Sequence, residues 1–248
     1  MSRLLIQVEG PTEEDFVKEV LRRHLIDRHG YHAVDARIVG NSRLREKRGG
    51  IRGWSVVKKE IVERLQHDRG VFITMLVDYY ALPKGPPEDD GWPGRSVPAN
   101  LPVAQKASSV ERALAAEIAS ALPSPQDHRR FIPFIVMHEF EALLFSDPAA
   151  MARGFNHADA EADLAAIASQ FSSPEEINDS PLTAPSKRII KVFEDRGYDR
   201  YEKPLLGNLA ALEITLPVIK TKCPLFGAWL GKLERLGAAA AAARPTTP

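Results

Sequence analysis

The chain has 248 residues, of which 44% are hydrophobic and 27% charged, a composition typical of a globular protein built around one large core. Its 33 basic residues balance its 33 acidic residues, so nucleic-acid binding would require a local basic patch rather than net charge. No apolar run approaches the ~18 residues of a membrane span, and the first residues do not have the pattern of a signal peptide. The lone cysteine, Cys223, excludes an internal disulfide. We therefore expect a soluble, cytoplasmic protein without membrane association, with Cys223 as a small buried side chain.

Three apolar runs are typical of strands buried on both faces of a parallel sheet, and each is followed closely by an acid. They are residues 4–8 before Glu9, residues 71–77 before Asp78, and residues 131–137 before Glu139 and Glu141. This repetition is the main functional signal in the sequence.

A helix-start pattern follows the first of these runs. Gly10 and Pro11 end the strand, and Thr12 with Asp15 is a variant of the capping box. Glu13 lies where the helix dipole favours an acid, and apolar residues recur at helical spacing as far as residue 25. Strand, turn and helix predict the start of a βαβ unit.

In the rest of the chain, predicted strands and helices alternate less regularly. A strand is predicted over 33–39, helices over 55–66 and 110–122, and between them a loop at 81–108 whose prolines and glycines exclude a helix or interior strand. A loop of this length is usually functional or mobile. Further helices are predicted near residues 148–153, 159–170, 186–195, 205–212 and 217–235. We predict an α/β core over 1–147, a helical extension over 148–236 packed on the same domain, and a disordered tail at 237–248.

Residues 40–59 form the most basic part of the chain. Gly49 and Gly50 would let a phosphate backbone approach closely, which favours a phosphate-binding loop. The alternative is a solvated loop followed by the polar face of the next helix. The cations concerned are Arg43, Arg45, Lys47, Arg48, Arg52, Lys58 and Lys59.

Ligands of open α/β sheets bind at the carboxyl ends of the strands, where Glu9, Asp78 and Glu139 or Glu141 are expected. Carboxylates that meet in one place repel one another unless a cation or proton intervenes. Mg²⁺ or Mn²⁺ prefers such oxygen ligands and suits phosphoryl-transfer chemistry. Any single strand-end acid is equally well explained as a cap or an ion-pair partner, and it is the third occurrence that favours a metal site.

Four segments together resemble a TOPRIM-like bacterial family over most of residues 3–235. They are VEGPTE at 8–13, VDYY at 77–80, HEFEALLFSD at 138–147 and APSKRI at 184–189. The first two are similar to signature segments of the TOPRIM catalytic domain shared by topoisomerases, primases and OLD-type nucleases. This resemblance implies a mostly parallel sheet flanked by helices and a nuclease activity.

The resemblance also implies roles for individual acids. Glu9 matches the TOPRIM glutamate, a metal ligand or general acid/base, and Asp78 matches the first acid of the DxD metal motif. Tyr80 stands where the second aspartate would be, and a phenol is a poor Mg²⁺ ligand. Glu139 and Glu141 are the natural replacements, with Glu139 preferred.

Two further segments carry candidate site residues. Lys187 resembles the late lysine of OLD-type nucleases, and with Ser186 and Arg188 it would form an anion clamp at a helix N-terminus. The alternative is an ordinary serine cap with surface cations. His138 is either a group that orients a carboxylate or acts as a base, or a structural hydrogen-bonding residue. Gly10, Thr12 and Glu13 lie beside Glu9 and are secondary candidates.

The remaining histidines do not favour a zinc site. His24, His29 and His32 are close in sequence, but no cysteine accompanies them and they straddle a predicted helix end.

The sequence thus predicts a Mg²⁺-dependent phosphodiesterase, most simply a nuclease acting on DNA or RNA. The resemblance suggests a role in bacterial defence or mobile-element control beside a separately encoded AAA or ABC-type ATPase, because no Walker motif is present. A homo-oligomer is compatible with this prediction. The alternative is a catalytically inactive TOPRIM-like module that binds nucleic acid or a partner ATPase.

Overall fold

The structure, a computed structural model, describes residues 2–39, 51–178, 180 and 182–242. The chain divides into two compact units. Unit 1 comprises Met1–Val77, Ala81–Ile135 and Lys232–Pro248, and unit 2 comprises Asp78–Tyr80 and Val136–Gly231. The division differs from the predicted boundary at residue 147, because each unit is assembled from separate stretches of chain.

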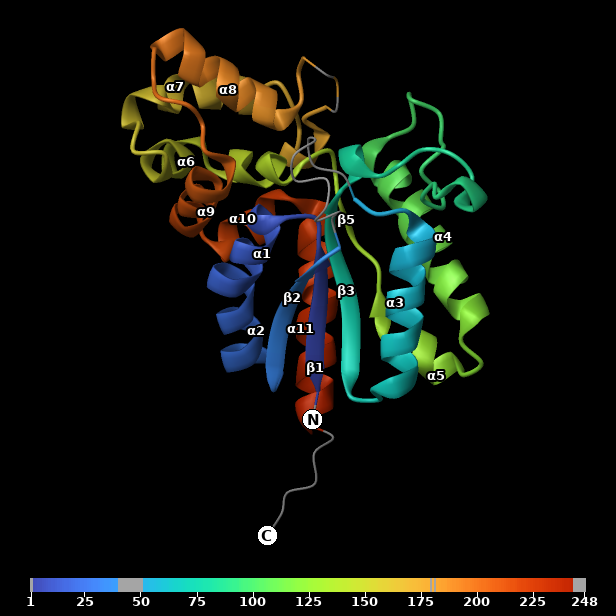
Figure 1. Cartoon of the computed structure of the whole chain (residues 1–248). Coiled ribbons are helices and arrows are strands. Elements are labelled where there is room, and N and C mark those ends of the chain that lie inside the picture. The colour runs from blue at the N-terminus through green and yellow to red at the C-terminus, as the bar shows by residue number, and fades with distance from the viewer. Residues whose placement is uncertain (1, 40–50, 179, 181, 243–248) are drawn as a thin grey trace. The chain divides into compact units, whose positions relative to one another are not determined.

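Unit 1 is built on a parallel sheet with strand order β2-β1-β3-β4 (Figure 1). The strands are β1 (Arg3–Val8), β2 (Ala33–Ile38), β3 (Val71–Asp78) and β4 (Phe131–Ile132). Val8 pairs with Ile38 on one side and with Leu76 on the other. The strands therefore end at one edge of the sheet, and the predicted α/β class with a mostly parallel sheet is confirmed.

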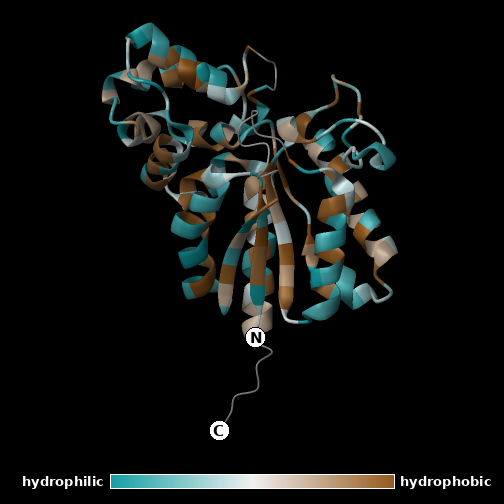
Figure 2. Cartoon of the chain, in the orientation of Figure 1, coloured by the Kyte–Doolittle hydropathy of each residue, from teal (hydrophilic) through white to brown (hydrophobic). Residues whose placement is uncertain are grey.

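The central strand β3 is buried along almost its whole length, as its continuous apolar sequence predicts. Figure 2 shows the strands as mainly hydrophobic and the surrounding helices as banded. In α3 (Trp54–His67), Trp54, Val57, Ile61 and Leu65 recur at helical spacing and are all buried. One face of α3 thus contributes to the core.

The first helix begins earlier than the Thr12 capping pattern predicted. Gly10 is the N-cap of α1 (Pro11–Phe16), and Pro11 occupies the first helical position, where its missing N–H costs nothing. The Glu13 carboxylate accepts a hydrogen bond of 3.0 Å from the Gly10 N–H. Thr12 is buried inside the first turn, so its assignment as the cap was wrong. A π-helical turn (Val17–Leu21) and α2 (Arg22–His29) continue the helix.

The proline-rich loop is shorter than predicted and is packed. Helix α4 (Val103–Ala121) begins seven residues before the predicted start of a helix at 110, and α5 (Pro125–His128) follows it. Within the loop, Trp92 has no exposed surface, and its indole N–H donates a hydrogen bond of 3.1 Å to the Arg52 carbonyl. Its ring lies 5.2 Å from that of Trp54. These contacts anchor the loop to the start of α3.

The third apolar run forms two short strands rather than one. β4 is followed, after Pro133, by β5 (Ile135–Val136), which also pairs with β3. Proline has no N–H to donate to a ladder, and this accounts for the interruption.

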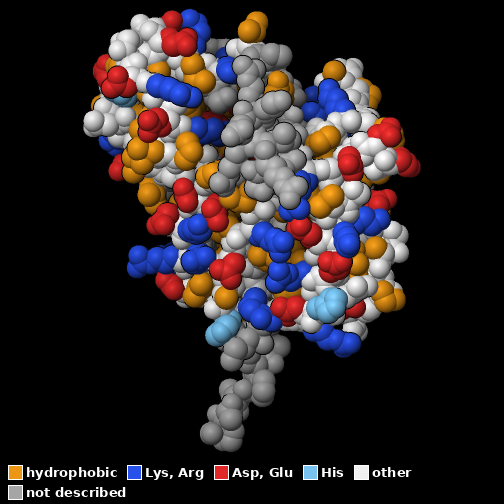
Figure 3. Space-filling model, in the orientation of Figure 1, with side chains coloured by type: hydrophobic (Ala, Val, Ile, Leu, Met, Phe, Trp, Pro, Cys, Tyr) orange, Lys and Arg blue, Asp and Glu red, His pale blue; other side chains and the backbone are white. Residues whose placement is uncertain are grey.

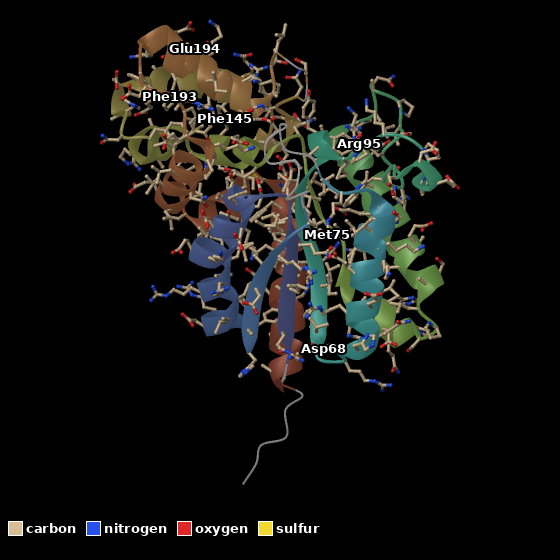
Figure 4. All side chains as sticks on the ribbon, in the orientation of Figure 1. Asp68, Met75, Arg95, Phe145, Phe193 and Glu194 are labelled. Carbon is tan, nitrogen blue, oxygen red and sulfur yellow. The ribbon has the colours of Figure 1, made fainter. Side chains whose placement is uncertain are left out.

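One buried arginine fixes the opposite edge of the sheet, where β3 begins. Arg130 donates hydrogen bonds to the carbonyls of Leu65, Asp68 and Val71 at 2.5, 2.6 and 3.1 Å. Asp68, labelled in Figure 4, accepts a hydrogen bond of 2.6 Å from Arg3 through its carboxylate. The turn between α3 and β3 is therefore held by charged groups.

Unit 2 is mainly helical, as predicted. Its elements are a buried 3₁₀ segment (Phe140–Ser146), α6 (Pro148–Gly154), α7 (Glu161–Ala168), α8 (Pro185–Arg196), α9 (Lys203–Ile214), α10 (Leu216–Lys222) and the first part of α11 (Pro224–Ala242). Helices α6 and α9 pack closely: a Cβ on Gly154 would lie 2.4 Å from the Ala210 Cα. Only glycine fits at this crossing.

The C-terminal region differs from prediction in two ways. The single helix predicted over 217–235 is divided at Cys223, because Pro224 starts a new helix there. Helix α11 then continues to Ala242, through part of the predicted disordered tail. Residues 243–248 lie outside the described residues.

Within the described residues, no helix has both the length and the apolar character needed to cross a bilayer. On the face shown in Figure 3, basic and acidic side chains are interspersed, in keeping with the balanced charge of the chain.

Candidate functional site

The end of β3 is tied to the segment that follows β5. Asp78 is buried, and its Oδ1 accepts a hydrogen bond of 2.9 Å from the Phe140 N–H. Two residues further on, the Tyr80 N–H donates to the His138 carbonyl at 3.0 Å. All four residues belong to unit 2. Asp78 is therefore held in a fixed orientation by the backbone of the motif that supplies Glu139 and Glu141.

His138, whose carbonyl accepts the hydrogen bond from Tyr80, has an unusual backbone conformation. Its φ of +65° lies in the left-handed region, which is uncommon for a residue other than glycine. The side chain is buried, and its ring makes an edge-to-face contact with Tyr79 at 6.4 Å. The structure places His138 at a tight turn beside Asp78, where it supports the backbone that holds the acid.

A buried carboxylate and a lysine form the centre of the candidate site. Glu141 has no exposed surface, and the Lys203 Nζ lies 2.9 Å from its Oε2. The same Nζ lies 3.9 Å from the Asp78 Oδ2. Lys203 is the first residue of α9, and Glu141 lies in the 3₁₀ segment. One ammonium thus faces two acids from different elements of unit 2.

Burial raises the pKa of Glu141 above its usual range, an effect that the positive charge of Lys203 opposes and the negative charge of Glu139 reinforces. Burial and the neighbouring Glu141 also raise the pKa of the Tyr201 phenol well above its usual range. Tyr201 therefore stays neutral beside the acid pair. In this desolvated setting the interactions between charges are stronger than at the surface.

Glu139 was predicted to be a metal ligand, but in the structure its carboxylate binds a backbone N–H group. Its Oε2 accepts a hydrogen bond of 2.9 Å from the Ser186 N–H, in the first turn of α8. The N-cap of α8 is Ala184, with Pro185 at the first helical position, so the serine cap was wrong. The carboxylate of Glu139 takes the place of the anion that the APSKRI segment was expected to bind, while Lys187 is exposed.

Protein partners are present for four of the described cations that were predicted to bind phosphate: Arg52, Lys58, Lys59 and Arg188. Arg188 donates to the Thr183 carbonyl at 2.9 Å, and its guanidinium lies 5.1 Å from the centre of the Phe171 ring. The Arg52 Nη1 lies 2.9 Å from a Glu60 oxygen. The Lys58 Nζ lies 2.6 Å from a Glu117 oxygen and the Lys59 Nζ lies 3.9 Å from a Glu63 oxygen. The remaining members of the basic loop lie outside the described residues: Arg43, Arg45, Lys47 and Arg48.

The remaining predicted residues are distributed as follows. Glu9 follows β1 in unit 1 and is partly buried. Tyr80, at the position of the second DxD acid, is 43% exposed. The structure therefore gathers Asp78, Glu139 and Glu141 in unit 2, with Glu9 at the end of a unit 1 strand.

The acids of unit 2 do not meet as three close metal ligands. In the part of the chain that the structure describes, the group of His, Cys, Asp or Glu whose ligand atoms all lie within 4.8 Å is His24, His29 and Glu234. Asp78 and Glu141 share Lys203 instead. A cation at this place would have two protein carboxylates and several waters, an arrangement that Mg²⁺ commonly adopts.

Sequence reasoning missed Lys203 and the pocket beside it. The pocket has a volume of about 520 Å³, and its walls include Phe193 and Glu194, both labelled on α8 in Figure 4. Its other lining residues are Ser186, Ile190, Tyr198, Asp199, Arg200, Tyr201 and Lys203. The order of aromatic and basic residues from Tyr198 to Lys203 is the feature of the sequence that could have indicated this pocket.

No curated protein and no solved structure matches the chain. A family model described as a domain of unknown function, DUF4276, matches residues 8–234. The matched span contains Glu9, Asp78, Glu139, Glu141 and Lys203. The chain therefore belongs to the DUF4276 family.

Proposed function

We propose that the protein hydrolyses phosphodiester bonds of nucleic acid with the help of Mg²⁺ or Mn²⁺. The observation that carries the proposal is the arrangement of Asp78, Glu141 and Lys203, in which two buried carboxylates share one ammonium. The resemblance to TOPRIM nucleases supports the same activity. Buried acids that face a common cation are typical of phosphoryl-transfer sites.

The residues fit a hard divalent cation. The Glu141 carboxylate is buried, and the Asp78 Oδ2 lies 3.9 Å from the Lys203 Nζ. The Glu141 carboxylate and the Asp78 Oδ2 would hold the ion, while the Asp78 Oδ1 remains bonded to the Phe140 N–H. When bound, the cation lowers the pKa of a water molecule and stabilises charge on the phosphate.

Lys203 and the adjacent pocket would position the substrate. Lys203 contacts both acids and also lines the pocket with Tyr198, Arg200 and Tyr201. Aromatic rings stack on nucleobases and basic groups neutralise phosphates, so this wall suits a nucleotide of the substrate. Glu139, bonded to Ser186, would position the Phe140–Ser146 segment that carries Glu141.

Other features of the proposal come from the sequence. Glu9 would act as a further metal ligand or general acid/base, Lys187 would contact phosphate, and the basic residues at 40–59 would hold the nucleic-acid backbone. On the same basis we propose a cytoplasmic role in bacterial defence or mobile-element control, beside a separately encoded AAA or ABC-type ATPase.

One observation favours a second candidate function, an inactive TOPRIM-like module that binds nucleic acid or the ATPase. The Lys203 ammonium already offsets part of the negative charge of Asp78 and Glu141, a task that would otherwise need a metal ion. In that case Lys203 replaces the cation permanently.

A cleavage assay separates the two functions. Single- and double-stranded DNA and RNA are incubated with the protein and Mg²⁺ or Mn²⁺, and Asp78→Asn, Glu141→Gln and Glu9→Gln are compared with wild type. We expect metal-dependent cleavage that falls at least 100-fold in the Asp78 and Glu141 variants, and no change in Glu161→Gln, which alters an exposed acid on α7. Nucleic-acid binding without cleavage would favour the inactive module.

A further inference from the structure

Two histidines and a glutamate converge in unit 1. His24 and His29 belong to α2 and Glu234 to α11. The Glu234 Oε1 lies 2.9 Å from the His24 Nε2 and 3.9 Å from the His29 Nε2. The two imidazole centres are 4.7 Å apart, with their planes at 49°. Both rings therefore direct a nitrogen at one carboxylate oxygen.

These distances match the spacing of ligands around a small cation. Tetrahedral Zn²⁺ with bonds of ~2.0–2.1 Å separates its ligand atoms by about 3.3 Å. The observed separations of 2.9 and 3.9 Å lie on either side of that value. The shorter one is also a hydrogen-bond distance, whereas the longer one exceeds it. One ligand atom from each of the three residues lies within 4.8 Å of the other two.

The chemistry of the donors selects the kind of metal. Two neutral imidazoles and one carboxylate form a common zinc ligand set, whereas Mg²⁺ takes oxygen ligands. The side chains are 20%, 23% and 12% exposed for His24, His29 and Glu234, so solvent can supply a fourth ligand. The ion would be distinct in kind from the Mg²⁺ proposed for the acid site.

The cluster lies where α11 already approaches α2 closely. A Cβ on Gly237 would be 2.4 Å from the His29 carbonyl oxygen. The Tyr31 hydroxyl donates a hydrogen bond of 3.0 Å to the Leu233 carbonyl. An ion held by His24, His29 and Glu234 would add a coordinate link between the two helices at this contact.

We propose that His24, His29 and Glu234 bind a transition-metal ion of the Zn²⁺ class, which fastens the C-terminal part of α11 to α2. The sequence alone did not favour zinc, because the third ligand lies 210 residues beyond His24. His32, the third histidine of the sequence cluster, is exposed and is not a member of the group.

The test uses the full chain without a polyhistidine tag, freed of metal with a chelator and then titrated with Co²⁺ and Zn²⁺. We expect one equivalent of Co²⁺ to bind with the visible absorption of a four-coordinate site, and Zn²⁺ to displace it. Zn²⁺ should also raise the Tm of the wild-type protein, whereas Mg²⁺ should not displace Co²⁺.

The decisive variant is His29→Gln, with His32→Gln as the matched control. His29→Gln should weaken Zn²⁺ binding at least tenfold and abolish the Zn²⁺-dependent rise in Tm, while His32→Gln should leave both unchanged. Unfolding of each variant in chelator shows whether the apo fold is intact. Failure of the wild type to bind one equivalent, or equal binding by His29→Gln and wild type, would overturn the proposal. Nuclease activity is not measured, so the result is independent of the proposed function.

Discussion

The ammonium nitrogen of Lys203 lies 2.9 Å from a carboxylate oxygen of Glu141, a side chain without exposed surface. Removing one partner of a buried ion pair leaves an uncompensated charge, and this is among the more costly single changes to a protein. The Lys203 side chain is 37% exposed, so solvent screens part of the effect. This pair is therefore important for stability as well as for the proposed chemistry.

Replacing Lys203 by methionine should make the stability of the protein depend more strongly on pH. Without Lys203, the pKa of Glu141 rises further above 4.5, so the folded state binds a proton that the unfolded state releases. The free energy of unfolding therefore falls as the pH rises from the pKa of Glu141 in the unfolded chain to its higher pKa in the folded protein. We expect a loss of about 1–3 kcal/mol at pH 8 and a smaller loss at pH 5, measured by urea unfolding. Lys203→Arg is the control, and an equal loss at both pH values would contradict the explanation.

Substitutions of Glu139 separate its role as a helix cap from a role as metal ligand. Glu139→Gln keeps an oxygen that can accept the Ser186 N–H and should lose less than ~0.5 kcal/mol, whereas Glu139→Ala should lose about 1 kcal/mol. Both are measured by thermal unfolding. If Glu139 acts through position alone, Glu139→Gln should also retain cleavage activity. A stable but inactive Gln variant would identify Glu139 as a metal ligand.

The thiol of Cys223 should be inert in the folded protein. Burial raises its pKa to about 12, and the sulfur lies 3.3 Å from the Ser146 hydroxyl. Because the thiolate is the reactive form, a disulfide reagent such as DTNB at pH 8 should modify one thiol within minutes in denaturant and almost none in the native state. Rapid modification of the native protein would show that the α10–α11 junction opens.

Loss of Arg130 should destabilise unit 1. Arg130→Met leaves the carbonyls of Leu65, Asp68 and Val71 without their charged donor and should cost about 3 kcal/mol in the free energy of unfolding. The neighbouring Arg129 is exposed, so Arg129→Met is a matched control and should change stability by less than ~0.5 kcal/mol. Similar losses in the two variants, measured by chemical unfolding, would show that these hydrogen bonds contribute little.

The strands were predictable because their signal is local. Continuous apolar runs such as that of β3 specify burial on both faces, and an acid directly after such a run must lie at the strand end. Two details were predicted wrongly because neighbouring residues favour different structures. Pro11 starts the first helix before Thr12 can cap it, and Pro133 divides the third apolar run into two strands. These outcomes depend on which of two adjacent signals prevails.

The partners within the site were not predictable, because they are remote in sequence. Glu139 accepts a hydrogen bond from Ser186, which lies 47 residues further along the chain, and Glu141 pairs with Lys203 at the start of α9. Each residue alone fits a cap, a surface charge or a ligand equally well. Only the packing of the helices of unit 2 decides among these roles.

The division of the chain also has a consequence for its synthesis. Unit 1 needs residues from Lys232 onward, which leave the ribosome only after all of Val136–Gly231. Until then Tyr31 has no Leu233 carbonyl to receive its hydroxyl hydrogen bond. The early strands therefore lack part of their unit while the whole of Val136–Gly231 is made, and a fragment that ends before Lys232 should leave unit 1 incomplete.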